Sequence, residues 1–140
     1  MTVQTQTSRV DYQGDNVTVN FPVPFPFLQD DYLLVIRTVI ATGVETFLTL
    51  DGIGADGYTV SGETEAAGHV LVVTAPTTLE RLSIIRDTPA TQLADFVAND
   101  PLPAESLENG LDKTTMIVAE IRTAVERCLQ LPLSAFNVST

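Results

Sequence analysis

The sequence has few of the side chains on which catalysis and redox chemistry depend. Its one cysteine, Cys128, cannot form a disulfide within the chain. Its one histidine, His69, lies where a loop meets a predicted strand, which favours a surface imidazole, and alone it does not support a metal site. No nucleophile-elbow, P-loop, dinucleotide-binding or EF-hand pattern is present. We therefore expect no catalytic residue, no metal and no cofactor, and a protein that is not an enzyme.

Tryptophan is absent, and the aromatic residues that sugar clefts usually present are scarce. The three tyrosines, Tyr12, Tyr32 and Tyr58, are far apart in the sequence. Paired carboxylates for glycoside cleavage are possible in so acidic a chain, but a cleft needs aromatic surfaces as well. This scarcity argues against a sugar-cleaving site.

Basic residues are outnumbered, with 7 Lys and Arg against 18 Asp and Glu and a net charge of −11. No Lys or Arg occurs between Arg37 and Arg81. A nucleic-acid binder needs such residues to displace counterions from phosphates, so we expect no nucleic-acid partner. Anionic membrane surfaces are disfavoured for the same reason. The acidity is typical of a solubilising surface, and a basic docking partner is the alternative.

Long apolar runs are also missing, so we expect no insertion into a membrane. The first residues have neither the basic region nor the apolar stretch of a secretory signal. We expect the product to stay in the cytosol unless it is assembled into something that carries it out.

What the first two thirds of the chain does contain is short, β-prone segments separated by turn signals. Residues 22–27 carry a proline at every second position, so they are predicted to be extended but not a central strand, with phenylalanines available for a core. Residues 33–40 are β-branched and apolar and are predicted to be central. They form a hairpin with residues 44–50. The predicted strands are residues 17–21, 33–40, 44–50, 58–60, 69–74 and 81–86. This pattern predicts a small antiparallel β-sandwich or barrel.

A long helix is predicted to follow, from Pro103 to about Leu131, with Pro132 ending it. Pro103 suits the first helical position, and Gly110 is the weak point of the helix, costing about 1 kcal/mol against Ala. The polar outer face is predicted to carry Glu120, Arg122, Glu126 and Arg127.

Apolar residues recur along this helix at alternating spacings of four and three, which is a heptad seam. The predicted oligomerisation residues are Leu107, Leu111, Thr114, Val118, Ile121, Val125 and Cys128. A second apolar stripe (Ile117, Ala124 and Leu131, with Met116 nearby) flanks the seam and suits either a bundle of more than two helices or docking onto the β domain. A helix of about 28 residues is about 42 Å long and exceeds the roughly 30 Å of such a β domain. This excess length favours self-association over an amphipathic helix folded back on the sheet. β-branched residues at one seam position and the lack of an Asn in the seam favour a trimer over a dimer.

The order of these segments resembles the N-terminal, virion-anchoring domain of bacteriophage tail fibres of short-tailed phages. The resemblance covers roughly residues 10 to 130 and is carried by the set of segments rather than by one motif. The matching stretches are residues 12–15, 21–27, 30–35, 42–45, 56–62, 71–76, 80–87 and 95–113.

The resemblance implies a virion protein, made in the host cytoplasm and located in the phage tail. It divides the chain into a tail-anchoring β domain (1–95), a linker and oligomerisation helix (96–131) and a C-terminal tail (132–140). The implied partners are two further copies of the chain in a homotrimer with a coiled-coil-like bundle, the tail tube, adaptor or nozzle proteins, and a downstream fibre or tailspike protein. Tail fibres usually continue into a shaft and a receptor-binding tip, so an end at Thr140 favours an anchor or adaptor. The alternative is a free-standing carbohydrate-binding β-sandwich for adhesion to the host surface.

Overall fold

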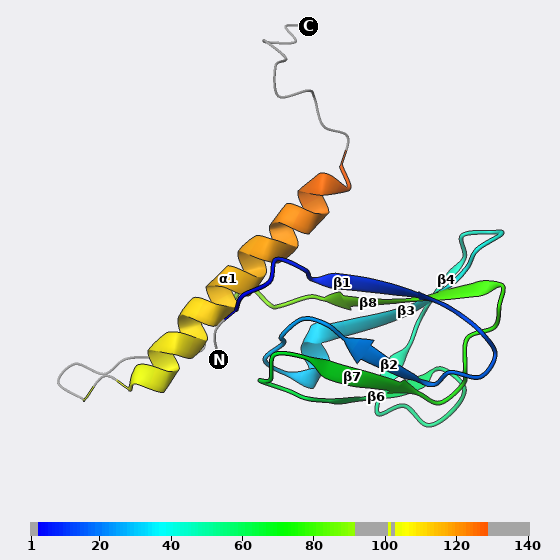
Figure 1. The fold of residues 1–140 in the computed structure, drawn as a ribbon, viewed down its shortest axis with the longest axis horizontal. Coiled ribbons are helices and arrows are strands. Elements are labelled where there is room, and N and C mark those ends of the chain that lie inside the picture. Colours follow the sequence, from blue (N-terminus) through cyan, green and yellow to red (C-terminus); the bar gives the residue numbers. More distant parts are fainter. Residues whose placement is uncertain (1–2, 92–100, 102, 129–140) are drawn as a thin grey trace, which may run out of the picture.

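A computed structural model of the chain describes residues 3–91, 101 and 103–128. Within this part, eight strands are followed by one long helix, so the prediction of a mainly β protein with a C-terminal helix is confirmed (Figure 1). The elements are β1 (Arg9–Gln13), β2 (Asn20–Val23), a 3-10 turn η1 (Asp30–Tyr32), β3 (Leu33–Val39), β4 (Glu45–Phe47), β5 (Thr49–Leu50), β6 (Gly57–Ser61), β7 (Gly68–Val72), β8 (Glu80–Arg86) and α1 (Ala104–Glu126).

The strands form two four-stranded sheets, in the orders β1-β8-β3-β4 and β2-β7-β6-β5. All neighbours are antiparallel except β5 and β6. The predicted central strand, β3, lies between β8 and β4, which confirms that prediction. The predicted strand at residues 17–21 begins only at Asn20 and runs on to Val23. Strand β1 was not predicted, although Val10 and Tyr12 alternate with polar residues and pack against the core.

The predicted strand at residues 44–50 is divided between the two sheets. Strand β4 pairs with β3, as the predicted hairpin requires, whereas β5 pairs with β6 in the other sheet. Between them, Leu48 turns into the core while its N–H donates to the carbonyl of Val35, at 2.9 Å. The chain therefore crosses from one sheet to the other at Leu48, whose side chain lies in the core.

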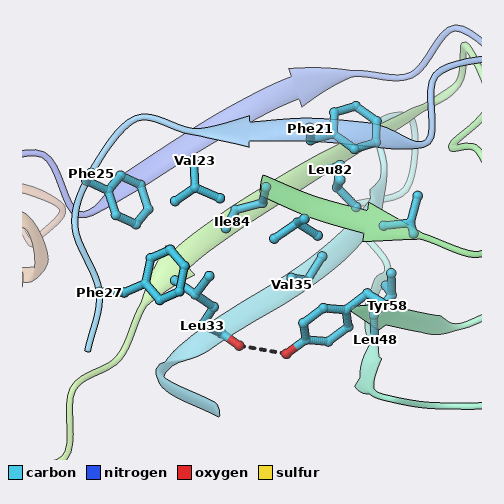
Figure 2. Packing of buried hydrophobic residues seen from close by; sticks show 12 residues of the cluster. Phe21, Val23, Phe25, Phe27, Leu33, Val35, Leu48, Tyr58, Leu82 and Ile84 are labelled. Carbon is cyan, nitrogen blue, oxygen red and sulfur yellow. Dashed lines mark hydrogen bonds between the residues drawn. The ribbon is translucent and has the colours of Figure 1, made fainter. Parts of the chain in front are cut away.

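A single hydrophobic core lies between the sheets and receives side chains from both (Figure 2). The proline-rich segment contributes Phe25 and Phe27, both buried, as predicted. Strand β2 lies at the edge of its sheet, which is the place where Pro22 removes no needed donor. The core residues are Phe21, Val23, Phe25, Phe27, Leu33, Val35, Leu48, Tyr58, Val70, Val72, Leu82 and Ile84.

Helix α1 runs across one end of the two sheets, while the turn between β3 and β4 lies at the opposite end (Figure 1). It begins one residue later than predicted, because Pro103 is the N-cap, and it ends at Glu126. The predicted continuation to Leu131 is therefore wrong at Arg127 and Cys128, which follow the helix, and residues 129–131 lie outside the described part. The predicted tail at 132–140 and most of the linker also lie outside it. Among the described residues, no helix combines the length and apolarity needed to span a membrane.

Candidate functional site: the helix and its two faces

One face of α1 packs against the end of the β domain. Met116 is fully buried there, and Asp112 and Ala119 are buried on either side of it. The backbone N–H of Val3 donates to the carboxylate of Asp112, at 3.3 Å. The buried face therefore consists of one large apolar side chain among small and polar ones, which is too little apolar surface to be recognised as a core stripe in the sequence.

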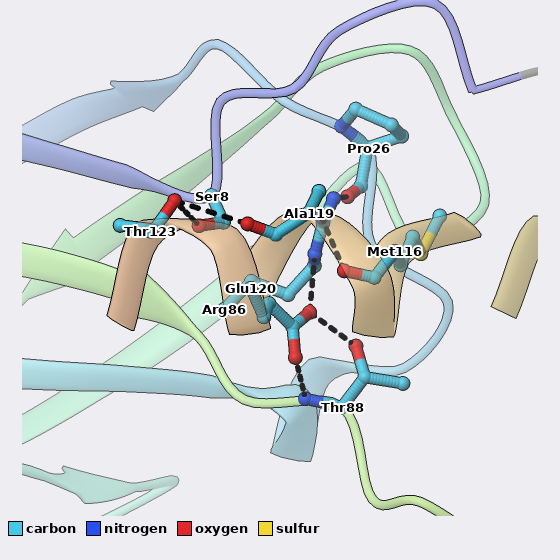
Figure 3. A network of polar contacts seen from close by, with 8 residues as sticks. All are labelled: Ser8, Pro26, Arg86, Thr88, Met116, Ala119, Glu120 and Thr123. Atoms are coloured by element: carbon cyan, nitrogen blue, oxygen red, sulfur yellow. Dashed lines mark hydrogen bonds and ion pairs between the residues drawn. The ribbon is translucent and has the colours of Figure 1, made fainter. Parts of the chain in front are cut away.

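A buried ion pair holds this face in place (Figure 3). Arg86, the last residue of β8, has a side chain with no exposed surface, and its Nε donates to Glu120 Oε1 of α1 at 2.7 Å. Its Nη1 donates to the carbonyl of Pro26 at 2.6 Å, and its Nη2 to the carbonyl of Met116 at 3.4 Å. The guanidinium carbon also lies 5.7 Å from the centre of the Phe25 ring. Every nitrogen of the buried guanidinium thus has an acceptor, which a buried charge requires.

The partner carboxylate is equally well satisfied. Glu120 accepts hydrogen bonds from the backbone N–H of Thr88, at 2.9 Å, and from its hydroxyl, at 2.7 Å. One helical turn further on, the hydroxyl of Ser8 donates to that of Thr123, at 3.0 Å. The helix is therefore attached directly to the residue before β1, to the end of β8 and to the residues after β8, and Arg86 joins it indirectly to the loop after β2.

The prediction that Glu120 lies on the polar outer face is wrong, because its side chain is 14% exposed and turned towards Arg86. Of the other residues predicted there, Arg122 and Glu126 are exposed and form an ion pair of 3.2 Å on the helix surface, and Arg127 is exposed. One signal in the sequence indicates the buried pair. Arg86 follows Leu82 and Ile84 at strand spacing, so an arginine stands at an inward position and needs a carboxylate partner.

The predicted oligomerisation residues lie on the other face of α1, away from the β domain. Six of the seven are in the helix, and the large apolar ones among them are 44% to 63% exposed. Cys128 is exposed, but it follows the end of the helix and so does not occupy a helical position of the seam in this structure. The helical members, all exposed, are Leu107, Leu111, Thr114, Val118, Ile121 and Val125.

Beside this exposed stripe, a groove of about 700 Å³ separates the first four turns of α1 from the β domain. The β-domain wall includes Leu28 and Tyr32, and the helix wall includes Gly110 and Ile117. The Nζ of Lys113 donates to the carbonyl of Thr91, at 2.6 Å, and lies 5.7 Å from the centre of the Tyr32 ring. The groove is thus mainly apolar and carries one cation that is already held by its own chain.

Acidic residues gather around the loop at residues 51–57. The pKa of Asp30 is raised by its burial and by the neighbouring charges of Asp51 and Asp31. Burial, followed by the same three carboxylates, also raises the pKa of Tyr58, whose hydroxyl donates to the carbonyl of Leu33. In the described part of the chain, no three metal-ligating side chains come close enough to hold an ion. The loop therefore presents a negatively charged surface.

No protein-family model matches the chain. It is 34% identical, over an alignment of 142 positions, to the tail spike protein of Salmonella phage epsilon15. The alignment includes 98% of this chain but only 12% of the tail spike protein, so the chain spans a small part of the length of that relative. Nearly the whole chain is therefore similar to one segment of a phage tail spike protein.

Proposed function

We propose that the chain is a structural protein of a phage virion, a homotrimeric anchor or adaptor that attaches a fibre or tailspike to the tail. The observation that carries this proposal is the row of exposed apolar side chains on the outer face of α1, at the spacing of a heptad seam. Exposed apolar stripes of this kind mark surfaces that another chain covers. The similarity to a phage tail spike protein supplies the virion as the setting.

In this proposal, three copies of α1 form a coiled-coil-like bundle, and each carries a small β-sandwich at its side. The buried pair of Arg86 and Glu120 fixes the direction in which the β-sandwich projects from the bundle. Exposed loops of the β domain, including residues 51–57, contact tail tube, adaptor or nozzle proteins. The negative charge around this loop favours a basic surface on the partner.

The proposed role is structural and not enzymatic. It needs the seam, the buried attachment of the helix and a docking surface, and it uses no catalytic group. A sugar-cleaving role would instead require two carboxylates on either side of a cleft, with aromatic surfaces for the sugar rings.

The oligomeric state tests the proposal most directly. The native chain is expected to have the mass of a trimer by light scattering after size exclusion, and Ile121→Asp to be a monomer, because it places a charge on each of three facing helices. Thr59→Asp, on an exposed position of β6, adds the same charge away from the seam and is expected to stay trimeric. A trimeric Ile121→Asp at low concentration would show that the seam is wrongly assigned.

Binding to the virion is tested separately, by co-elution of the native chain with purified phage tails. We expect the trimer to co-elute and to ignore a panel of host-surface glycans. A monomer that ignores tails and binds glycans would replace the proposal with the carbohydrate-binding alternative.

A further inference from the structure

The groove beside α1 and the exposed seam are parts of one continuous surface. Leu107, Leu111 and Thr114 line the groove and also belong to the seam. Whatever covers the seam at this level of the helix therefore reaches the mouth of the groove. The other wall of the groove is the β domain, through Leu28, Gln29 and Tyr32.

Gly110 indicates how closely another chain approaches the helix wall of the groove. It lies inside the helix, where glycine is the least favourable residue after proline. Its φ is ordinary, and a Cβ added there would meet no atom of the described residues within 4 Å, apart from its chain neighbours and the backbone of its own helix. Nothing in the described part of one copy therefore requires a glycine at this position, which lines the groove. A close approach by another chain would require it.

The heptad register identifies which part of a neighbour reaches this place. With Leu111 and Val118 at the a positions, Gly110 and Ile117 occupy g, and Thr115 and Arg122 occupy e. In a parallel bundle, the g residues of one helix face the e residues of the next. The g positions lining the groove carry no charge, so they offer a neighbour contact by packing rather than an interhelical salt bridge.

The geometry points to a second copy of this chain as the occupant of the groove. The helix of the neighbouring copy lies against Gly110 with its own Thr115, and its flank contacts Leu28 and Tyr32 of the first copy's β domain. This inference rests on the proposed trimer and goes beyond it. Each β domain holds two helices, its own through Arg86 and its neighbour's through the groove.

Cross-linking between differently tagged copies tests this arrangement. Both chains carry Cys128→Ser, which removes the native thiol; one also carries Leu28→Cys and the other Thr115→Cys. Thr115 does not line the groove of its own copy, so a link between these positions joins two chains. After co-expression and treatment with a short bismaleimide, a product that carries both tags is expected on a denaturing gel. Thr59→Cys, on the exposed side of β6, replaces Leu28→Cys in the matched control and is expected to give little product.

The outcomes separate this inference from the proposed function. A trimeric mass with a doubly tagged product well above the control supports both. A trimeric mass with the product at the control level overturns the inference alone. A monomeric mass overturns both.

A second variant tests the inference without a cross-linker. Gly110→Leu should raise the dissociation constant of the trimer by about tenfold or more, because its side chain fills the space that the neighbour needs. Glu105→Leu, at an exposed position in the first turn of the same helix, should leave the constant unchanged. An unchanged dissociation constant for Gly110→Leu would overturn the inference.

Discussion

Removing the carboxylate of Glu120 is expected to detach α1 from the β domain while leaving the two sheets folded. In Glu120→Ala, the guanidinium of Arg86 stays buried without its counter-charge, and both donors of Thr88 lose their acceptor. Breaking a buried pair by removing one partner costs about 3–5 kcal/mol. Met116, the one large apolar side chain fully buried on this face of the helix, contributes about 1.5–3 kcal/mol by its burial. The free energy lost by leaving Arg86 buried without its partner exceeds the free energy gained by burying Met116. Undocking of the helix therefore lowers the total free energy.

Hydrogen exchange followed by mass spectrometry distinguishes undocking from general unfolding. In the monomeric Ile121→Asp background, peptides of α1 between residues 112 and 124 should lose most of their protection in Glu120→Ala, since an isolated helix of this length is marginal in water. Peptides of β3 and β8 should keep theirs. The comparison is made at one protomer concentration, because association stabilises the folded chain by mass action.

The matched control is Glu126→Ala, which removes a carboxylate from the same helix. Its partner is Arg122, and both side chains are 61% exposed. Such a pair contributes about 0.3–0.5 kcal/mol, so the exchange of the helix should hardly change. If Glu120→Ala behaves like this control, the buried pair does not hold the helix, and the reasoning from burial is refuted.

Three further predictions concern the β domain. Gly68→Ala should lower stability by about 1–3 kcal/mol in denaturant titrations, because the added Cβ would lie 2.7 Å from Phe27 Cε1. Asp15 should titrate at about 2 by NMR, since hydrogen bonds from the hydroxyl and N–H of residue 18 lower its pKa from 3.8. Its contribution to stability is present above pH 3.8 and is lost as the pH falls towards 2. Asp15→Asn should therefore flatten that part of the acid-unfolding curve. Tyr58→Phe should cost about 0.5–1.5 kcal/mol by thermal unfolding, because the buried hydroxyl donates to the carbonyl of Leu33 at 2.7 Å.

Sequence reasoning found the parts of the fold that depend on local rules. Prolines at alternate positions restrict a strand to an edge, and Pro22 indeed lies in an edge strand. An apolar, β-branched run belongs between two neighbours, as β3 does. Both predictions need only the chemistry of a few adjacent residues.

The parts that sequence reasoning missed depend on contacts between distant segments. Glu120 was placed on the outer face because the exposed stripe of α1 is more apolar than the buried one, so a helical wheel assigns its inner and outer faces the wrong way round. Only the position of Arg86, at the end of an inward-facing row, could have corrected this. The division of residues 44–50 between two sheets was missed too, because Leu48 alternates correctly in the sequence while it leads the chain into the other sheet.

The attachment of α1 to segments far away in the chain has a consequence for the order of folding. Ser8 and Thr123, which share a hydrogen bond, are separated by 115 residues, so this contact can form only after Thr123 has been synthesised. The ion pair of Arg86 likewise cannot form until Glu120, 34 residues later, has been synthesised. During translation, the two sheets can therefore assemble before the helix leaves the ribosome, since domains fold as units from the N-terminal side. The helix then docks onto the sheets, and docking determines which face of the helix remains exposed to water. In the proposed trimer, association between copies is then the last event, and it is prepared by the docking step, because a helix that had not yet docked would offer its partners every face at once.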